Sequence, residues 1–440
     1  MKTFAIETYG CRMNICDSEV IISILTENGF AYSDDVAAAD IIILNSCSVR
    51  EDGHNKIFER LDYIKSHISL LSRIVVITGC FATLLTTDLF TTYPFVNIIV
   101  PPNAYRALPL LLQQVASGEK HLSVPAIDNN DLYEDILPTR YIEDQTTAAI
   151  NVMKGCNQGC SYCIEPITRG KEHCRSVDSI LREARDIVQK GYRELTLVGH
   201  LIDKYRWVNP QTGEIVHFAK LLGMTAKNCP DVRIKFLSSH PAFLDDDTLR
   251  TISTYPNIMK VVHLPIQSAS NAVLERMNRG YTQETIAEKI QHIRTIIPDI
   301  SIITDVMVGF CGETYDDFLQ TSKFIQEIQF DDINVFCFSM RTGTKAFLTY
   351  KDDVPASEKL RRANVIKELN RSIKQTKYQH LIGTSVDVLI EGFYHDKRMF
   401  GRDKNHRNVI IAPQTGIQIN DTISVHISSA TPNALIGFCL

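Results

Sequence analysis

Short apolar runs alternate with amphipathic stretches over the first 120 residues of the chain. The alternation predicts, in order, a strand at 2–8, a helix at 18–28, a strand at 40–44, a helix at 55–65, and strands at 73–78 and 96–100. Short apolar strands separated by helices are typical of a parallel sheet with both faces covered. We therefore expect an open parallel α/β domain over residues 1–120.

Residues 121–145 interrupt this pattern, because they are acidic and irregular, and we interpret them as a linker. The alternation then resumes and predicts a second domain at residues 146–378. Its strand-like segments are 149–154, 194–200, 233–238, 260–266, 301–309 and 331–338. Serial βα units of this length indicate a partial or complete (β/α) barrel, whose site lies at the carboxyl ends of the strands.

The pattern changes again toward the end of the chain. Residues 357–379 predict a long helix with one apolar stripe and a cationic face. Short strand-like segments follow at 384–392, 407–413 and 421–430. They predict a small all-β module at residues 379–440.

Composition narrows the possible functions. The 440 residues are 44% hydrophobic and 22% charged, which is typical of a globular protein. Their net charge of −5 excludes a uniformly basic nucleic-acid-binding protein but allows local basic surfaces. No apolar run approaches the roughly 18 residues of a membrane helix, and the first residues lack a signal-peptide pattern. We expect a cytoplasmic protein without a membrane partner.

The chain contains twelve cysteines. Cytoplasmic thiols stay reduced, so patterned cysteines there are more often metal ligands or catalysts than disulfides. Cys156, Cys160 and Cys163 form a C-x3-C-x2-C spacing directly after a predicted strand. Three thiolates on one loop favour a 4Fe–4S cluster with one open iron, whereas zinc commonly takes four ligands and no fourth is evident nearby. A zinc site and a chance spacing of buried cysteines stay open as alternatives.

Three further cysteines share one setting. Cys11, Cys47 and Cys80 each follow a predicted strand of the first domain. The carboxyl ends of parallel strands lie at one edge of a sheet, so we expect these three thiols to converge. The other six lack ligand spacing and are interpreted as core or incidental residues: Cys16, Cys174, Cys229, Cys311, Cys337 and Cys439.

The C-x3-C-x2-C loop in its βα setting resembles the radical S-adenosylmethionine (SAM) superfamily. The strand-end cysteines and the segments PITRGKE, SSHP, HLPIQSASNAVLERMNRGYT and TDVMVGFCGET resemble the methylthiotransferase family within it. The closing module, with FGRDKNHRNVII, resembles the TRAM RNA-binding domain. The resemblance covers nearly the whole chain, and TYGC-x-MN at the first cysteine is most similar to the members that act on N(6)-dimethylallyladenosine in tRNA.

This resemblance implies two 4Fe–4S clusters and SAM as cofactors. It implies a radical SAM cluster on the second-domain cysteines, Cys156, Cys160 and Cys163, and an auxiliary cluster on Cys11, Cys47 and Cys80. Further candidates for contact with SAM or the target base lie at or near strand ends or beside a cluster cysteine: Tyr162, Gly199, Ser238, Ser239, Gln267, Arg279 and Asp305.

The resemblance also implies two uses of SAM. One molecule methylates a sulfur carried at the auxiliary cluster. Another is reductively cleaved, and its radical removes the hydrogen from carbon 2 of the adenine. That C–H bond has no useful acidity, so acid–base side chains alone cannot perform the reaction.

The implied partner is the anticodon stem-loop of tRNA, whose unpaired bases can be splayed out and read. Basic residues of the closing module are expected to contact its phosphates: Lys397, Arg398, Arg402, Lys404 and Arg407. Residues 359–377, with seven Lys or Arg and one acid, are a second expected contact. We expect a monomer that needs an electron donor and a sulfur source, neither of which the sequence identifies.

Two alternatives stay open. The first is a methylthiotransferase that acts on threonylcarbamoyl-adenosine in tRNA or on a ribosomal protein. The second is a zinc- or cluster-bearing RNA-binding protein without catalysis. Departures from the family pattern near the expected SAM and tRNA contacts are the reason to keep the second: Arg12, Glu165, His200, Leu201, Ala269 and Thr342.

Overall fold

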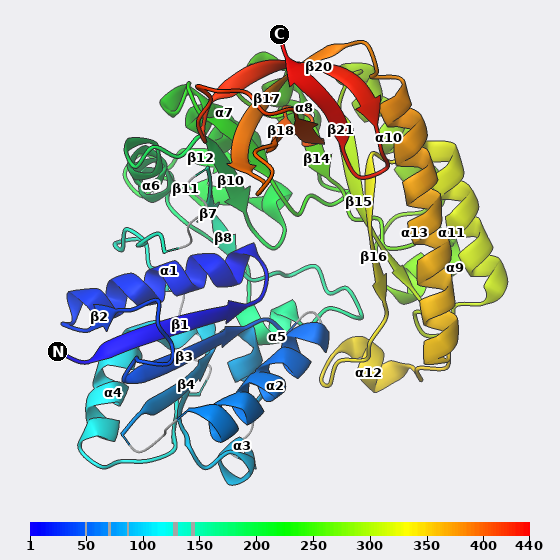
Figure 1. Cartoon of the computed structure of the whole chain (residues 1–440). Helices are drawn as coiled ribbons and strands as arrows, with labels where there is room; N and C mark the ends of the chain where they lie inside the picture. Colours follow the sequence, from blue (N-terminus) through cyan, green and yellow to red (C-terminus); the bar gives the residue numbers. More distant parts are fainter. Residues whose placement is uncertain (49–50, 69–71, 86–87, 126–130, 142–145) are drawn as a thin grey trace. The chain divides into compact units, whose positions relative to one another are not determined.

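The computed structural model describes residues 1–48, 51–68, 72–85, 88–125, 131–141 and 146–440, without the side chains of residues 51–54 (Figure 1). The chain forms two compact units. The first comprises Met1–Tyr141, Met153–Gly159 and Cys163–Ser179, and the second comprises Ile142–Val152, Cys160–Tyr162 and Ile180–Leu440.

A six-stranded sheet with parallel neighbours forms the centre of the first unit, in the order β2-β1-β3-β4-β5-β6. The strands are β1 (Thr3–Tyr9), β2 (Ala31–Tyr32), β3 (Ile41–Ser46), β4 (Ile74–Thr78), β5 (Val96–Val100) and β6 (Leu122–Ser123). All residues of β3 and β4 are buried, as their unbroken apolar runs predict. The predicted open parallel sheet is confirmed.

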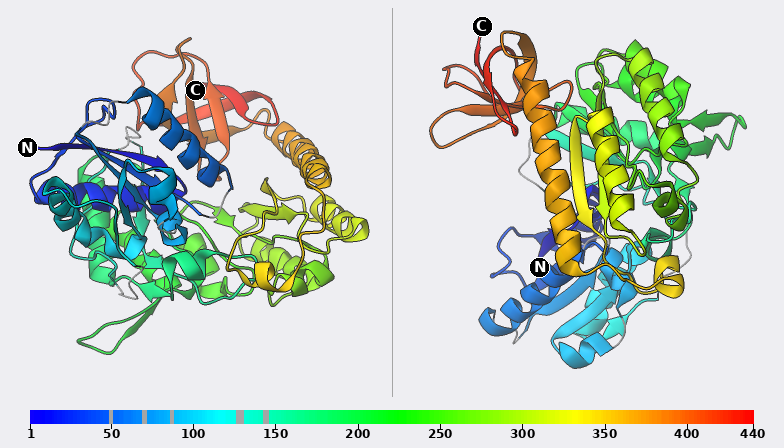
Figure 2. Two further views of the ribbon diagram at one scale, coloured as in Figure 1. Left: turned by 90° about the horizontal axis from the view of Figure 1, so that it is seen from below. Right: turned by 90° about the vertical axis from the view of Figure 1, so that its right-hand side faces the viewer.

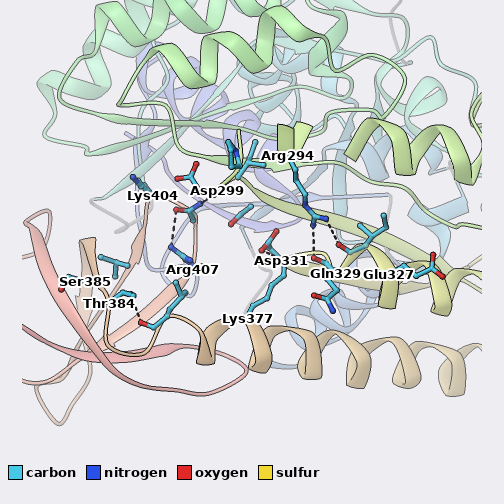
Figure 3. Close-up of a pocket in the computed structure, with 17 residues that line it drawn as sticks. Arg294, Asp299, Glu327, Gln329, Asp331, Lys377, Thr384, Ser385, Lys404 and Arg407 are labelled. Atoms are coloured by element: carbon cyan, nitrogen blue, oxygen red, sulfur yellow. Dashed lines mark hydrogen bonds and ion pairs between the residues drawn. The ribbon is translucent and has the colours of Figure 1, made fainter. Parts of the chain in front are cut away.

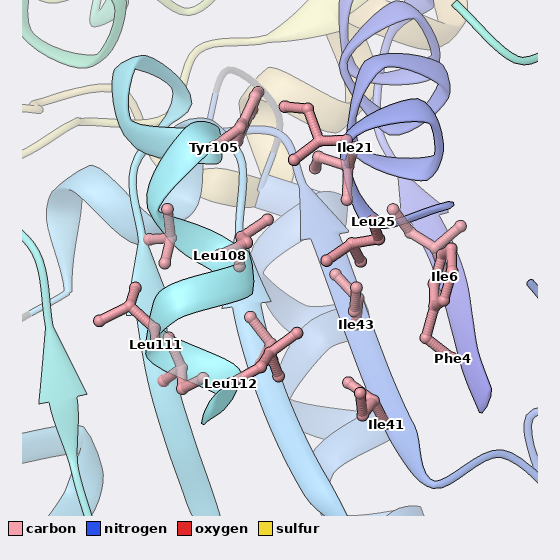
Figure 4. Close-up of a cluster of buried hydrophobic side chains, with 14 of the residues drawn as sticks. Phe4, Ile6, Ile21, Leu25, Ile41, Ile43, Tyr105, Leu108, Leu111 and Leu112 are labelled. Carbon is pink, nitrogen blue, oxygen red and sulfur yellow. The ribbon is translucent and has the colours of Figure 1, made fainter. Parts of the chain in front are cut away.

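Helices cover both faces of this sheet: α1 (Arg12–Glu27), α2 (Glu51–His67), α3 (Asp88–Thr92), α4 (Leu108–Ala116) and the 3-10 helices η1 (Cys80–Leu84) and η2 (Pro102–Ala107). The short helix α5 (Glu165–Arg169) packs against η1 and η2. Ile41 and Ile43 of β3 point to the face that α1 and α4 cover (Figure 4). Ile42 and Leu44 point to the opposite face, which α2 covers. The two-residue period of a buried strand thus supplies both cores.

The first helix begins earlier than the sequence predicts. It starts at Arg12, directly after Cys11, where the Cys11 amide donates to Asn14 Oδ1 at 3.3 Å. Residues 12–17 mix polar and apolar side chains without a clear helical period, but a hydrogen-bonded cap is sufficient to begin a helix there. Cys11 therefore lies at the N-terminus of a 16-residue helix.

Residues 121–145 are more than the predicted linker in their described part. β6 pairs with β5 at the edge of the sheet, and Tyr133 and Ile136 are buried in the core beside α1. The acidic composition concealed these two apolar anchors. Residues 126–130 and 142–145, which include the predicted boundary at 145, lie outside the described residues, so the domain bounds stay predictions.

Six parallel strands of the second unit follow one another in chain order: β7 (Thr147–Asn151), β10 (Glu194–Val198), β13 (Arg233–Phe236), β14 (Val261–His263), β15 (Ser301–Val308) and β16 (Asp332–Cys337). They form two three-stranded sheets. Backbone hydrogen bonds from Met259 to Ile234 and from Ser239 to His263 join the two. This arrangement is that of a partial (β/α) barrel, as predicted.

The remaining helices between these strands are α6 (Val177–Gln189), η3 (Ile202–Lys204), α7 (Phe218–Asn228), α8 (Asp246–Thr254), α9 (Asn271–Arg276), α10 (Gln283–Ile296) and α11 (Tyr315–Ile328), and α12 (Lys345–Thr349) follows β16. Two short strand pairings were not predicted: β8 (Met153–Lys154) with β9 (His173–Cys174), and β11 (Arg206–Val208) with β12 (Ile215–His217). The residues of β8 belong to the strand predicted at 149–154, which the structure divides into β7 and β8. Among the helices that the structure describes, none has the length and apolar character that crossing a membrane requires.

A closed five-stranded barrel ends the chain and follows the predicted long helix, α13 (Ala356–Gln379) (Figure 2). Its strands are β17 (Ser385–Phe393), β18 (Met399–Asp403), β19 (Asn408–Ile411), β20 (Thr422–Ala430) and β21 (Leu435–Cys439). The sequence predicted β17, β19 and β20. It missed β18 and β21, because the glycines of MFGRD and LIGFC weaken the strand pattern.

Gly79 lies between β4 and Cys80 in the first unit, where the backbone passes close to Ser46. Its φ is +84°, and a Cβ on it would lie 2.5 Å from the carbonyl oxygen of Ser46. Gly118 also has a positive φ, but no atom lies within 4 Å of the corresponding Cβ position.

We expect Gly79→Ala to lower the free energy of unfolding by about 2–4 kcal/mol. The left-handed backbone costs about 1–2 kcal/mol, and the steric overlap adds about 1–2 kcal/mol. Gly118→Ala is the matched control and should show the backbone cost alone. Denaturant unfolding measures both, and equal losses would contradict the close approach at Gly79.

Candidate functional site

Three cysteines of the first unit lie directly beyond the ends of adjacent parallel strands. Cys11 follows β1, Cys47 follows β3, and Cys80 begins η1 after β4. The side chains of Cys11 and Cys47 are hydrogen-bonded, and Cys80 is close enough to Cys11 for their charges to interact. The structure thus brings the three thiols together at one edge of the sheet, as expected. Their role as ligands stays a prediction.

Buried amides join the loops that carry these thiols. Asn14 Nδ2 donates to Asn45 Oδ1 at 3.1 Å, and Asn45 Nδ2 donates to the Asn14 carbonyl and to Ser18 Oγ, both at 2.8 Å. Asn14 belongs to the helix that Cys11 begins, and Asn45 lies two residues before Cys47. These bonds fix the first thiol relative to the second.

A buried cation lies beside the same thiols. Arg169 Nε donates to Cys80 Sγ at 2.9 Å, and Nη2 lies 2.6 Å from Asp17 Oδ2. The two charged side chains are 0% and 3% exposed, respectively. Arg169 Nη1 and the hydroxyl of buried Tyr105 have no hydrogen-bond partner among the described residues.

The surroundings of these thiols change the pKa values of two of them. The hydrogen bond with Cys47 raises the pKa of Cys11. Burial raises the pKa of Cys80, and the positive charge of Arg169 opposes that change. In the described part of the chain, no three His, Cys, Asp or Glu side chains are arranged to hold a single metal ion. Three sulfur donors, a buried guanidinium and its orphaned Nη1 fit an anionic iron–sulfur cluster bound by thiolates.

The cysteines of the C-x3-C-x2-C spacing lie on the loop between β8 and α5. Cys156 Sγ accepts from the Gln158 amide at 3.4 Å, and Cys163 Sγ lies 3.8 Å from Glu165 Oε2. Cys160 Sγ accepts from Arg279 Nη1 at 3.2 Å. Their convergence on one cluster stays a prediction.

Glu165 is one of the departures from the family pattern, and it contacts the Cys163 thiol. Burial raises the pKa of this carboxyl to about 7. An acidic side chain therefore lies directly beside a predicted cluster ligand.

A polar network crosses the carboxyl ends of β13 to β16. Asp305 Oδ1 accepts from His263 Nε2 and from Asn334 Nδ2, each at 2.9 Å. His263 Nδ1 accepts from the Ser238 amide at 3.4 Å. Gln267 pairs with Asp305 through its backbone at a φ of +67°, and its buried Oε1 has no partner among the described residues. Sequence reasoning named three of these five residues.

His263 and Asn334 are the two that sequence reasoning missed. The available signal was their position, because each lies on a strand beside one that carries a predicted residue. His263 is the last residue of β14, and its ring lies between the Ser238 amide and the Asp305 carboxylate.

The other cofactor candidates have partners within the protein. The hydroxyl of Tyr162 accepts from Arg279 Nη1 at 3.3 Å, and its ring packs against Phe310 at 6.4 Å between centroids. Ser239 Oγ donates to Asp203 Oδ1 at 2.9 Å. Gly199 is buried directly after β10. Contact of these residues with SAM stays a prediction.

Three of the six cysteines without ligand spacing are core residues, as expected. The buried ones are Cys16, Cys229 and Cys311, while Cys174 and Cys439 are partly buried and Cys337 is exposed. Cys311 packs in a cluster with Phe310 and Phe338. Its place near a strand end is therefore explained by packing.

Ion pairs occupy part of the predicted basic surface of the barrel. Arg398 pairs with Asp396, Arg402 with Glu391, and Arg407 with Asp403, at 2.6–2.7 Å. The two lysines of this set, Lys397 and Lys404, are exposed. The lysines thus offer charge to solvent more freely than the arginines.

The cationic face of α13 is largely paired inside the protein. Ion pairs engage five of its basic residues: Lys359, Arg361, Arg362, Lys374 and Lys377. Only Lys367 and Arg371 of the predicted set are exposed without an ion pair among the described residues. The expected second phosphate contact is correspondingly weakened.

A cavity of about 610 Å³ lies where α13 meets the barrel (Figure 3). Lys377, Lys404 and Arg407 line it together with the carboxylates of Asp299 and Asp331. Lys377 Nζ lies 2.7 Å from Asp331 Oδ1. Because acidic and basic groups face one another, this cavity has no chemistry that selects a phosphate.

Comparison with known proteins gives two family matches and full-length relatives. Residues 150–325 match the Radical SAM superfamily, and residues 3–101 match the uncharacterized protein family UPF0004. The tRNA-2-methylthio-N(6)-dimethylallyladenosine synthase of Bacteroides thetaiotaomicron is 38% identical over 439 residues, which cover 99% of this chain and 96% of that protein. The protein of the same name from Porphyromonas gingivalis is 36% identical over 438 residues, 98% of this chain and 94% of that one.

Solved structures are similar at the level of fold. The radical S-adenosylmethionine methyltransferase TsrM from Kitasatospora setae, with cobalamin and a [4Fe-4S] cluster bound, has a TM-score of 0.58 at 12% identity, covering 79% of this chain and 74% of that one. The cobalamin-dependent radical enzyme OxsB has a TM-score of 0.56 at 15% identity, covering 84% and 56%. The radical SAM α/β fold with a parallel sheet is thereby confirmed.

Asp203, the partner of Ser239, makes stability depend on pH. Burial raises the pKa of this carboxyl to about 7, although Ser239 Oγ and the His240 amide donate to it. The usual value is about 3.9. Between roughly pH 4 and 7 the folded chain therefore holds a proton that the unfolded chain has lost, and stability falls as the pH rises through this window.

Asp203→Asn keeps the side chain neutral at every pH. We expect this variant to lose less stability between pH 4 and 8 than the unaltered chain, by on the order of 1–3 kcal/mol. Denaturant unfolding between pH 4 and 8 measures it. Asp247→Asn makes the same charge change at an exposed position of α8 and should leave the slope in place. An Asp203→Asn profile parallel to that of the unaltered chain would show that Asp203 titrates normally.

Proposed function

The chain belongs to the tRNA-2-methylthio-N(6)-dimethylallyladenosine synthase family, and from this membership we propose that it attaches a methylthio group to carbon 2 of N(6)-dimethylallyladenosine beside the anticodon of tRNA. One observation carries the proposal: 38% identity to such a synthase over 439 residues, with both chains covered almost completely. The protein is a radical SAM enzyme, and its cofactors are two 4Fe–4S clusters and SAM.

The ligands that we propose for these clusters are six cysteines. Cys156, Cys160 and Cys163 hold the radical SAM cluster, and Cys11, Cys47 and Cys80 hold the auxiliary cluster. Bound cofactors supply the radical and sulfur chemistry that a C–H bond of an adenine requires. The convergence of the first-unit thiols beside a buried cation supports the second assignment.

We propose that the strand-end network of the second unit binds SAM. Ser238, His263 and Asp305 are already hydrogen-bonded to one another, so their positions are set before a ligand arrives. Gln267 Oε1 is an acceptor without a partner among the described residues, and leaving such an atom unsatisfied costs about 1–3 kcal/mol. An ammonium or hydroxyl group of SAM would satisfy it. Tyr162, Gly199 and Ser239 complete the proposed surroundings.

The closing barrel is proposed as the TRAM module that binds the anticodon stem-loop. At the turn between β17 and β18, Phe393 and Tyr394 are 44% and 43% exposed. The Arg398 guanidinium lies 5.4 Å from the Tyr394 ring centroid, and Lys397 is exposed beside it. Exposed aromatic rings next to cations are what stacking on unpaired bases requires.

We further propose that the protein acts as a monomer in the cytoplasm, where its tRNA is found, and that other proteins deliver electrons and sulfur. A methylthiotransferase that acts on threonylcarbamoyl-adenosine or on a ribosomal protein is the alternative. Nucleoside mass spectrometry of a deletion strain separates the two. The deletion should abolish 2-methylthio-N(6)-dimethylallyladenosine and leave its unmethylthiolated precursor, whereas an unchanged level of the methylthio nucleoside refutes the substrate assignment.

Iron counting tests the ligand assignment. After anaerobic reconstitution with iron and sulfide we expect about eight irons per chain, since two cubes of four irons are held by three cysteines each. The Cys156/Cys160/Cys163 triple alanine variant should retain about four. The matched control is the Cys174/Cys337/Cys439 triple alanine variant, which should retain about eight. Stoichiometric zinc, or an equal loss in both variants, would contradict the assignment.

Binding of tRNA tests the barrel surface. We expect Tyr394→Ala to weaken binding by about 1–3 kcal/mol, the usual contribution of one stacked base. Lys397→Ala should weaken binding less and reduce the slope of log K against log salt by about 1. Fluorescence anisotropy with an anticodon stem-loop at several salt concentrations measures both effects.

Tyr315→Ala is the control for this experiment. Tyr315 is 52% exposed on α11, and Arg361 lies 5.5 Å from its ring centroid, so it repeats the same pair of side chains outside the barrel. Its substitution should leave the affinity unchanged. Equal effects of Tyr315→Ala and Tyr394→Ala would remove the barrel turn as the RNA contact.

A further inference from the structure

Arg169 contacts both a predicted cluster cysteine and a buried carboxylate. It ends α5, six residues after Cys163, yet its Nε donates to Cys80 Sγ at 2.9 Å. Asp17, one turn and a half into the helix that Cys11 begins, holds the other side of the guanidinium at 2.6 Å. A residue from the C-x3-C-x2-C segment thus reaches the other set of cysteines within the first unit.

The burial of this pair argues for a specific electrostatic role. Removing two charges from water costs several kcal/mol each, and an ion pair recovers this only when its remaining donors are also satisfied. Here Arg169 Nη1 and the Tyr105 hydroxyl are buried without hydrogen-bond partners among the described residues. The polar cluster is therefore incomplete without a further anionic group beside it.

A positive charge next to thiolate ligands has a definite effect on an iron–sulfur cluster. The reduction potential of such a cluster depends on its net charge and on hydrogen bonds to its sulfurs. Arg169 supplies both, because it donates a hydrogen bond to one sulfur and keeps its charge at every accessible pH. Asp17 acts in the opposite sense, since its negative charge offsets part of that of Arg169.

We propose that Arg169, oriented by Asp17, is a positioning residue that raises the reduction potential of the cluster on Cys11, Cys47 and Cys80 by donating to the Cys80 thiolate. This assignment rests on the proposed function, which places a cluster there. It differs from a purely structural ion pair, because a structural pair would contribute to stability and leave the potential unchanged.

The test uses the full chain with Cys156, Cys160 and Cys163 replaced by alanine, so that only the cluster of the first unit is present. EPR-monitored redox titration after anaerobic reconstitution gives its midpoint potential. In this background Arg169→Gln should reduce the ratio of reduced to oxidised cluster at least tenfold at a fixed solution potential, about 59 mV for one electron. Arg169→Lys keeps the charge and should restore most of the ratio.

Two further variants test the direction in which the midpoint potential moves and provide a control. Asp17→Asn leaves the charge of Arg169 without its counterion, so the midpoint potential should move in the opposite direction from that of Arg169→Gln. Arg140→Gln breaks another buried ion pair of α1, with Glu19, whose side chains are 5% and 6% exposed. It should lower stability without moving the potential.

An Arg169→Gln cluster with an unchanged potential overturns the proposal while leaving the proposed function intact. If Arg169→Gln loses its iron, Arg169→Lys decides the outcome. Retention of iron by Arg169→Lys supports the role of charge. Loss of iron in both variants shows that only the shape of the side chain matters, and this overturns the proposal. Absence of any cluster in the parent variant would overturn both this assignment and the proposed auxiliary site.

Discussion

The parallel pairing of β1, β3 and β4 is the constraint on which the first site depends. Its register places Tyr9 opposite Ser46 and Asn45 opposite Thr78, so the three strands end at the same level. The cysteines that follow them are distant in sequence and adjacent in space. Because side chains alternate between faces, a slip of one residue would invert the buried faces of β3 and separate the thiols. The two hydrophobic cores therefore also protect the geometry of the site.

Buried polar groups fix the positions of the cysteine loops that the sheet brings together. The reciprocal amides of Asn14 and Asn45 join the first and second cysteine loops, and Gly79 allows the third loop to approach Ser46 closely. Arg169 adds a cation from a distant segment of the chain. Asn14 and Asn45 satisfy part of each other's hydrogen-bonding capacity, whereas Arg169 Nη1 lacks a hydrogen-bond partner among the described residues. In the second unit the same principle holds, since the Asp305 network orders several strand ends before any ligand is present.

Sequence patterns predicted most of the fold because the relevant signals are local. Apolar runs located every strand of the first sheet except the short β2 and β6, and the spacing of cysteines after those runs predicted their convergence. The misses have a common cause, which is dependence on contacts between distant residues. The start of α1 depends on a polar cap, the burial of Tyr133 on a core built by other elements, and β18 and β21 on closure of a barrel. No local pattern reveals that Arg169 reaches Cys80, or that ion pairs engage most cations of α13.

We propose that two sets of three cysteines act in one methylthiolation reaction, and the ratio of the products distinguishes this mechanism from others. Reconstituted protein, a reductant, SAM and tRNA that carries N(6)-dimethylallyladenosine would be analysed by mass spectrometry. We expect one 5′-deoxyadenosine and one S-adenosylhomocysteine for each methylthio group formed at carbon 2, and no methylthio product when Cys11, Cys47 and Cys80 are replaced by alanine. Full product formation by that triple variant, or SAM cleavage that never yields the methylthio nucleoside, would contradict it.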